Sequence, residues 1–241
     1  MTTDANHLTT PPATARDTPR GPVVDHGVIH DLLNPLTSVV GNIDLLDEIL
    51  RGQAAPQVLK SLGAALASAE ELRDMIENLR YLMFEGTPAA PAMTRMDLAV
   101  MFKRLEEQAR SRALDKPPTE FHIHATRPLM VKANDKLLRR AMDVLLRTVT
   151  RLGTRSTADI TQSGDAAVDV RFAHHGRAIP DDLTGCLFDP GFAQIQYDRA
   201  VKIDRARGLW FVRRVAEAHR GAVHYEPRTD GGDFVVRLPL E

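Results

Sequence analysis

A histidine, a carboxylate and an amide lie close together near the start of the chain. His30 is followed directly by Asp31, and Asn34 lies one helical turn further along the same face. A neighbouring carboxylate can hold one imidazole nitrogen protonated and leave the other as a nucleophile, and an amide can position phosphoryl oxygens or an attacking water. These three residues therefore predict a site that accepts a phosphoryl group.

The residues around this site follow the pattern of a long amphipathic helix. Pro35 lacks the N–H that would bond to the carbonyl of Asp31, so we expect the helix to bend there. Apolar side chains repeat every seven residues at one position and again three residues on, at Ile29, Leu36, Ile43 and Leu50 and at Leu32, Val39 and Leu46.

A second segment repeats the pattern after a break at residues 52–56. Its apolar positions are Leu62, Ala69, Ile76 and Met83, and Ala65, Leu72 and Leu79. The two helices predict a hairpin whose apolar stripes are wider than a lone hairpin can cover. Pairing with a second copy of the chain in a four-helix bundle would cover them, so we expect a homodimer.

The composition excludes several classes of protein. The 241 residues carry 31 basic and 32 acidic side chains, and a formal net charge of −1 argues against nucleic acid or an anionic membrane as the partner. The single cysteine, Cys186, excludes an internal disulfide and a cysteine-based zinc site. No apolar run approaches the length of a membrane span, and the N-terminus lacks the apolar core of a signal peptide, so we expect a cytoplasmic protein.

The chain divides into a tail, a hairpin and a second domain. Residues 1–22 predict a disordered tail, residues 23–87 the helical hairpin, residues 88–95 a linker and residues 96–241 a mixed α/β domain. Within that domain the patterns predict helices near residues 97–113, 134–152 and 207–219, and strands near 119–125, 129–133, 158–163, 167–173, 222–227 and 233–239. The segment 180–206 is too long for a simple connection and predicts a loop or lid.

Charge is divided between the two domains. Residues 23–87 hold ten acidic and four basic side chains, whereas residues 88–241 hold 20 acidic and 25 basic side chains. Either these are two solvated faces, or the acidic hairpin and the basic domain attract each other or separate partners. The sequence leaves these alternatives open.

The segment HDLLNPLTSVVGNIDLL at residues 30–46 resembles the H-box of the dimerisation and histidine-phosphotransfer domain of two-component sensor histidine kinases. That box reads His-Glu/Asp-x-x-Asn/Thr-Pro-Leu, and it matches here at His30, Asp31, Asn34, Pro35 and Leu36. The resemblance implies that His30 accepts the phosphoryl group, that Asp31 orients the imidazole and that Asn34 contacts the phosphoryl group.

The second domain resembles the ATP-binding domain of the same family, an α/β sandwich of the Bergerat type. In the family's N-box, Asn-Leu-Leu-x-Asn-Ala, the second Asn holds Mg²⁺. Here Val144 and Thr148 take the two Asn positions. The resemblance therefore implies that the metal ligand is absent from this chain.

The box that recognises adenine in the family, Asp-x-Gly-x-Gly-Ile-Pro, reads HHGRAIP at residues 174–180. The first glycine, Gly176, and the final Ile-Pro are kept, whereas Ala178 replaces a glycine and His174 replaces the Asp that accepts from the adenine amino group. A charged imidazole would donate where the family's Asp accepts, and in any state it removes a strong acceptor.

The box that cradles the phosphates in the family, Gly-x-Gly-Leu, reads Ala206-Arg207-Gly208-Leu209. One glycine is lost, and Arg207 would crowd a backbone that must approach phosphates closely. Asp233 stands where the family often has Thr near the base. With four nucleotide elements altered, we expect no bound cofactor and a vestigial ATP pocket at His174, Gly176, Ala178 and Gly208.

We interpret the chain as a phosphorelay protein of the α+β class, with a helical hairpin that forms a dimeric four-helix bundle followed by a degenerate ATPase domain. His30 would exchange a phosphoryl group with receiver aspartates of response regulators, which would supply the Mg²⁺, without ATP-dependent kinase activity of its own. The expected partners are receiver domains and a second copy, with a sensor histidine kinase as a further candidate. Neither nucleic acid nor a membrane is expected.

Two alternative functions stay open. The chain could be a soluble histidine kinase or a phosphatase that uses ATP and Mg²⁺ through compensating residues. It could also be a non-catalytic pseudokinase scaffold that binds a kinase or a response regulator.

Two further histidines share one face of a predicted strand, at His122 and His124. No cysteine or carboxylate cluster lies near them in the sequence, so we expect surface histidines there and no metal site.

Overall fold

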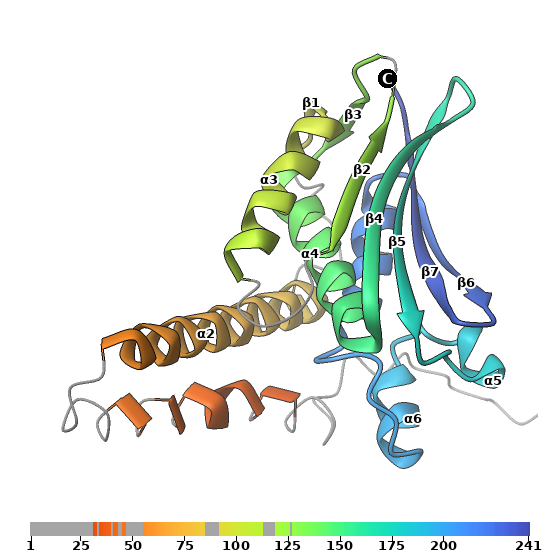
Figure 1. Ribbon diagram of the computed structural model, residues 1–241. Coiled ribbons are helices and arrows are strands. Elements are labelled where there is room, and N and C mark those ends of the chain that lie inside the picture. Colours follow the sequence, from red (N-terminus) through yellow and green to blue (C-terminus); the bar gives the residue numbers. More distant parts are fainter. Residues whose placement is uncertain are drawn as a thin grey trace, which may run out of the picture.

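The computed structural model describes residues 31–32, 34–39, 41–42, 45–46, 55–84, 92–112, 119–125 and 127–241. His30, the predicted tail and residues 88–91 of the predicted linker lie outside the described residues. All described residues before residue 47 are helical, and α2 (Ala55–Phe84) runs alongside them (Figure 1). The helical region followed by an α/β domain confirms the predicted fold class.

The second domain alternates helices and short strands, as the periodicity predicts. Its elements are β1 (Thr94–Asp97), α3 (Leu98–Arg112), β2 (Glu120–His124), β3 (Met130–Ala133), α4 (Asp135–Leu152), β4 (Gly153–Ser163), β5 (Ala167–Gly176), α5 (Asp181–Thr184), α6 (Phe192–Asp198), α7 (Gly208–Ala218), β6 (Ala222–Arg228) and β7 (Gly231–Pro239). No helix in the described part of the chain is both long and apolar enough to cross a membrane.

A five-stranded mixed sheet forms the centre of this domain, with the strand order β2-β4-β5-β7-β6. The β2–β4 pair is parallel and the other pairs are antiparallel, while β1 and β3 form a separate antiparallel pair. Figure 1 shows α3, α4 and α7 on one face of the sheet, and none of the described helices covers the other face. This is the two-layer sandwich that the sequence predicts.

The hydrophobic core lies between the sheet and these helices. Along β5, the alternate residues Val168, Val170 and Phe172 are fully buried, because successive side chains of a strand point to opposite faces. Helix α4 is amphipathic and buries Leu138 and Leu145 against them. One face of α4 is therefore committed to the core, and the other face is left for contacts outside the sheet.

A buried histidine, His219, joins the start of helix α4 to the end of helix α7. Asn134 caps α4, because its side-chain oxygen accepts from the backbone N–H of Leu137 at 3.0 Å. The backbone N–H of Asn134 donates to Nε2 of His219 at 3.0 Å, and Nδ1 of His219 bonds to the carbonyl of Val215 at 2.7 Å. Burial lowers the pKa of His219, so the ring is neutral and links the start of α4 to the end of α7.

The structure differs from the predicted elements in three places. β4 begins at Gly153 rather than near residue 158, because its pairing with β5 continues through an irregularity between Gly153 and Arg155. β1 lies partly inside the predicted linker, and its pairing with β3 makes it a strand. The predicted loop or lid at 180–206 contains the short helices α5 and α6.

One glycine of β7 makes room for a tyrosine from the neighbouring strand. A Cβ atom on Gly232 would lie 2.0 Å from the Oη atom of Tyr225. Tyr225 is buried and packs against Phe234 with a distance of 4.9 Å between ring centroids. The tyrosine can keep this position only if residue 232 has no side chain.

We expect Gly232→Ala to lower the free energy of unfolding by about 2 kcal/mol, because the added methyl displaces the Tyr225 ring. Urea denaturation measures this loss. Gly185→Ala is the matched control, because a Cβ on Gly185 meets no atom within 4 Å, and its effect should stay within about 0.5 kcal/mol. Equal losses in the two variants would contradict the explanation.

Candidate functional site

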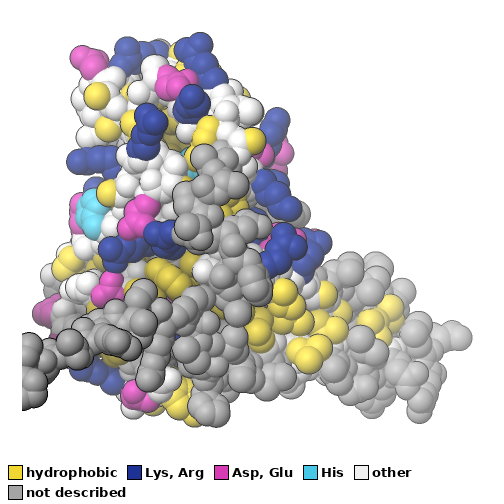
Figure 2. Space-filling model, turned by 180° about the vertical axis from the view of Figure 1, so that it is seen from behind, with side chains coloured by type: hydrophobic (Ala, Val, Ile, Leu, Met, Phe, Trp, Pro, Cys, Tyr) yellow, Lys and Arg dark blue, Asp and Glu magenta, His cyan; other side chains and the backbone are white. Residues whose placement is uncertain are grey.

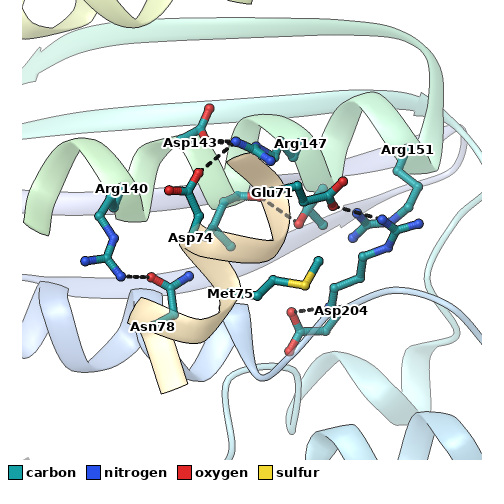
Figure 3. A pocket seen from close by; sticks show the side chains of 12 residues that line it. Glu71, Asp74, Met75, Asn78, Arg140, Asp143, Arg147, Arg151 and Asp204 are labelled. Carbon is teal, nitrogen blue, oxygen red and sulfur yellow. Dashed lines mark hydrogen bonds and ion pairs between the residues drawn. The ribbon is translucent and has the colours of Figure 1, made fainter. Parts of the chain in front are cut away.

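A cleft lies where α2 passes over α4 and over the loop that precedes α7 (Figure 3). Four arginines and four carboxylates line it, together with the two altered N-box residues. The lining residues are Glu71, Asp74, Met75, Asn78, Arg140, Asp143, Val144, Arg147, Thr148, Arg151, Asp204 and Arg205. The two altered N-box positions, Val144 and Thr148, therefore open towards the helical hairpin.

Ion pairs hold α2 against the second domain. Across this cleft they are Arg147 with Asp74 at 3.0 Å and Arg205 with Glu71 at 2.8 Å (Figure 3). Arg140 also pairs with Glu77 of α2 at 2.8 Å, beside the cleft. The acids come from α2 and the bases from α4 and from the loop before α7. Of the two alternatives that the charge division left open, these pairs favour attraction between the acidic hairpin and the basic domain.

The predicted phosphoacceptor segment touches the loop before α7. Oδ2 of Asp31 accepts from the backbone N–H of Ala206 at 3.1 Å. Ala206 is the first residue of the stretch that resembles the phosphate-cradling box. Asn34 is helical and its backbone carbonyl accepts from Oγ of Ser38 at 3.2 Å. The structure thus brings Asp31, the neighbour of His30, to the predicted nucleotide loop.

A buried carboxylate caps the start of α7. Oδ1 of Asp204 accepts from the backbone N–H groups of Arg205 at 2.8 Å and Leu209 at 3.0 Å. The start of a helix favours negative charge and is the kind of position where phosphates bind in many proteins. Burial raises the pKa of Asp204 to about 7, in spite of these two bonds. The chain therefore places its own carboxyl group where an anion would bind.

The loop before α7 is held by two side chains. Oε1 of Gln196 accepts from the backbone N–H groups of Ile203 at 3.1 Å and Asp204 at 2.8 Å, and its Nε2 donates to the carbonyl of Asp204 at 2.9 Å. Nη2 of Arg151 donates to the carbonyl of Ile203 at 2.8 Å. Burial lowers the pKa of Arg151 from its usual value.

Ala206, which replaces a glycine of the phosphate-cradling box, adopts a backbone conformation that favours glycine. Ala206 has φ 47° and Arg207 has φ 58°, both in the left-handed region that favours glycine. Two successive residues with side chains in this region are strained. Arg207 is buried rather than extended across the loop, and its guanidinium lies 5.7 Å from the ring centroid of Trp210.

The N-box positions face Gly208 at the start of α7. A Cβ on Gly208 would lie 2.9 Å from Cγ1 of Val144, so the glycine allows α7 to approach α4. The hydroxyl of Thr148 is buried and donates to the carbonyl of Val144 at 2.8 Å. The described residues at these two positions therefore do not fit Mg²⁺ in the way that the family's second Asn does.

His174 lies fully buried at the end of β5. Its Nε2 is 3.1 Å from Oη of Tyr225, and that hydroxyl donates to the carbonyl of Gly231 at 3.1 Å. Burial lowers the pKa of His174 to about 4, so the ring is neutral near pH 7. The expectation that this imidazole could be a charged donor does not apply in the folded protein.

The hydrogen bonds of Tyr225 are satisfied together in one tautomer of His174. When the hydroxyl donates to the carbonyl of Gly231, its oxygen accepts from Nε2–H of His174. The other ring nitrogen, Nδ1, is then an acceptor, and it is buried without a hydrogen-bond partner among the described residues. The replacement of Asp by His therefore keeps an acceptor at this position.

Gly176 and Ala178, the other predicted pocket residues, lie at and just after the end of β5. Gly176 is exposed with φ 143°, and its N–H donates to the carbonyl of Asp230 at 2.8 Å. Ala178 is also exposed, and nothing in the structure explains why it replaces a glycine. Asp233 is buried and pairs with Arg171 at 2.7 Å and with Arg228 at 2.8 Å. This carboxylate is neutralised within the sheet.

Several residues of the site could not be found from motifs. Asp204 and Gln196 match no element of the family pattern that we identified, and Glu71 sits in a helix among other acids. Two signals were present, namely the charge difference between the domains and the acid shortly before Gly208. Neither signal indicates which side chains meet, because the contacts join segments far apart in the sequence.

Two protein families match the chain in the order that the motifs indicate. The family described as His Kinase A (phospho-acceptor) domain matches residues 26–83. The family described as Histidine kinase-, DNA gyrase B-, and HSP90-like ATPase matches residues 133–241, and it implies binding of ATP and Mg²⁺ for kinase activity.

Known relatives share both regions. Sensor protein VanSC of Enterococcus gallinarum is 24% identical over 218 residues, which cover 87% of this chain and 58% of the relative. Sensor protein VanS of Enterococcus faecium is 28% identical over 217 residues, with 87% and 55% covered. The chain thus spans little more than half the length of these relatives.

The fold also matches a solved complex. The structure of the histidine kinase ThkA in complex with the response regulator protein TrrA has a TM-score of 0.55 and 19% identity, with 89% of this chain and 60% of that chain covered. At this identity the likeness concerns the fold.

These comparisons correct the interpretation drawn from the altered boxes. A phosphorelay protein without kinase activity of its own is not supported, because the chain matches both family models and its relatives include the sensor histidine kinase AtsR of Burkholderia thailandensis, 24% identical over 89% of this chain and 36% of the relative. The physical reason for the correction is that a changed residue does not by itself remove an interaction. Ala206 has a positive φ of the kind that favours glycine, and His174 has a buried ring nitrogen without a partner among the described residues.

The two family models match the chain in the order that the motifs indicate. The structure is consistent with this order, because a helical segment packs against the loop before α7 and a mixed sheet follows in the second domain. The chain belongs to the two-component histidine kinase family.

Proposed function

We propose that the chain is a histidine kinase with a divergent ATP site, which phosphorylates His30 from ATP and passes the phosphoryl group to an aspartate of a response-regulator receiver domain. In the first step, a ring nitrogen of His30 would bond to the γ-phosphorus, the bond from that phosphorus to the bridging oxygen would break, and ADP would leave. In the second step, the receiver carboxylate would take the phosphoryl group and restore the imidazole.

One contact carries this proposal, the bond between Oδ2 of Asp31 and the backbone N–H of Ala206 at 3.1 Å. It joins the segment next to His30 to the loop that resembles the phosphate-cradling box, within one chain. Phosphoryl transfer depends mostly on positioning, so the acceptor and the nucleotide loop have to lie close together. In this role Asp31 both orients the imidazole of His30 and docks its helix on the loop.

The base would be recognised by His174. Its Nδ1 is a buried acceptor without a partner among the described residues, and its ring is neutral because burial lowers its pKa to about 4. The amino group of adenine is a hydrogen-bond donor and would satisfy that nitrogen. Gly176, Ala178 and Gly208 would form the rest of the pocket, as the resemblance implies.

The charge of the phosphates would be met by arginines. Thr148 has its hydroxyl bonded to the carbonyl of Val144 at 2.8 Å and does not fit the metal, so we derive no step through Mg²⁺. Arg151 and Arg205 line the same cleft on the side of the loop before α7. Guanidinium groups bind phosphate oxygens through paired N–H donors.

A second copy of the chain would cover an apolar groove on the hairpin. The groove lies between the helical residues 34–39 and α2, and Leu36 and Ile76 are 44% and 51% exposed in it. Figure 2 shows hydrophobic side chains gathered along the part of the surface where the hairpin projects from the second domain. An apolar surface of this kind favours a dimer. The homodimer, the receiver partner and the cytoplasmic location stay predictions.

We expect acid-labile phosphate to appear on the purified chain when it is incubated with labelled ATP and Mg²⁺, and to be lost completely in His30→Ala. His26→Ala is the matched control, because it removes a nearby histidine outside the H-box and should keep the label. If the wild-type chain takes no label from ATP while it remains folded, the kinase proposal fails and the pseudokinase scaffold becomes the better account.

The role of His174 predicts a preference for a base with a 6-amino group. Wild-type protein should bind ATP about tenfold more tightly than ITP, since ITP lacks the donor and would leave Nδ1 unsatisfied. His174→Phe should abolish this preference, and calorimetric titration measures both affinities. If His174 had only a structural role, His174→Phe would weaken the binding of both nucleotides equally. An unchanged ratio of ATP affinity to ITP affinity in the variant would therefore contradict base recognition.

The cap at the start of α7 predicts a pH dependence of nucleotide binding. Burial raises the pKa of Asp204 to about 7, so this carboxyl is mostly neutral at pH 6 and mostly charged at pH 8. Relative to Asp204→Asn, wild-type affinity for ADP should be nearly equal at pH 6 and about tenfold weaker at pH 8, because the charged group repels the phosphates. Comparison with the variant removes the effect of proton binding to ADP itself. The explanation would be contradicted if the ratio of wild-type to Asp204→Asn affinity were the same at pH 6 and pH 8.

A further inference from the structure

Three side chains that can bind metals lie together on the uncovered face of the sheet. His122 and His124 are two residues apart on β2, and their side chains are 44% and 61% exposed. Asp159 lies on β4, directly beside His122 in the parallel pairing. The carboxylate that we did not find near these histidines in the sequence is therefore supplied by the neighbouring strand.

The ligand atoms have the spacing of a small metal site. Nδ1 of His122 is 2.9 Å and Nε2 of His124 is 3.6 Å from the same oxygen, Oδ1 of Asp159. The three ligand atoms all lie within 4.8 Å of one another. Zn²⁺ binds nitrogen and oxygen at about 2.0–2.1 Å, which puts neighbouring ligands of a tetrahedral site roughly 3.3 Å apart. Small side-chain rotations would bring these atoms to that spacing.

The surroundings orient the carboxylate and leave it available. The other oxygen of Asp159, Oδ2, accepts from Oγ1 of Thr157 at 3.0 Å, which is the kind of outer contact that orients metal ligands. Arg171 pairs with Asp159 in the β4–β5 register, but its guanidinium is bound to Glu226 and to Asp233. Among the described residues, Asp159 forms ion pairs with the two histidines alone.

We propose that His122, His124 and Asp159 form a binding site for a divalent transition-metal ion, with Zn²⁺ as the preferred ion and water in the fourth position. Imidazole nitrogen favours Zn²⁺, Cu²⁺ and Ni²⁺, whereas Mg²⁺ and Ca²⁺ prefer sites made of oxygen alone. The ion would connect β2, at the edge of the sheet, to β4. The site lies on the face of the sheet opposite α4 and α7, away from the nucleotide elements.

Titration of the whole chain with ZnCl₂ in a calorimeter tests the proposal. We expect one Zn²⁺ per chain that is displaced by neither MgCl₂ nor CaCl₂, and an affinity that falls about tenfold or more in His124→Ala and in Asp159→Asn. Both side chains are outside the core, so circular dichroism should show both variants folded. Replacing Zn²⁺ by Co²⁺ should give the strong visible absorption of a tetrahedral ion, and the two variants should lose it.

His224→Ala is the matched control. His224 is an exposed histidine 3.0 Å from Glu226 on β6, which makes a pair but not a triad. This variant should bind Zn²⁺ as tightly as the wild-type chain. The proposal is overturned if the wild-type chain binds no Zn²⁺, or if His124→Ala and His224→Ala bind it with the same affinity, since the ion would then sit on other histidines.

Discussion

The ion pairs between α2 and the second domain determine where the phosphoacceptor segment lies. Arg147 of α4 and Arg205 of the loop before α7 reach acids on α2, at 3.0 Å and 2.8 Å. They hold the hairpin over the cleft, and Asp31 can then reach Ala206. Pairs at a partly buried interface contribute more than pairs on an open surface, because water and salt screen them less. The proposed chemistry depends on this arrangement of charges, since it brings the phosphoacceptor segment close to the predicted nucleotide loop.

The divergent boxes show that a residue can change while its physical contribution stays. Ala206 replaces a glycine of the family's box and still adopts a positive φ, at a cost in strain. The resemblance implies that the family has a carboxylate at position 174 to accept from adenine, and His174 supplies an acceptor in the tautomer whose Nε2–H donates to Tyr225. Val144 and Thr148 are different, because neither an apolar side chain nor an internally bonded hydroxyl can replace a metal ligand.

Periodicity and motifs predicted the hairpin, the two-layer domain and most elements within a few residues, because these depend on local patterns. The polar contacts of the site depend on pairings between distant segments. Asp159 stands beside His122 only because β2 and β4 pair in parallel, and Tyr225 meets His174 across β7. Asp204 is one acid among many in the sequence, and its role appears only once α7 begins four residues later. β1 likewise becomes a strand through its partner β3.

Gln196 has a consequence for how the cleft opens. Its amide forms three bonds to the backbone of Ile203 and Asp204, so one side chain fixes two successive peptide groups. When that amide rotates away, all three bonds break together, and the strained backbone at Ala206 and Arg207 can relax in the same event. Opening of this loop would therefore be cooperative rather than a fraying from one end, and amide hydrogens in this stretch would exchange with solvent at one common rate.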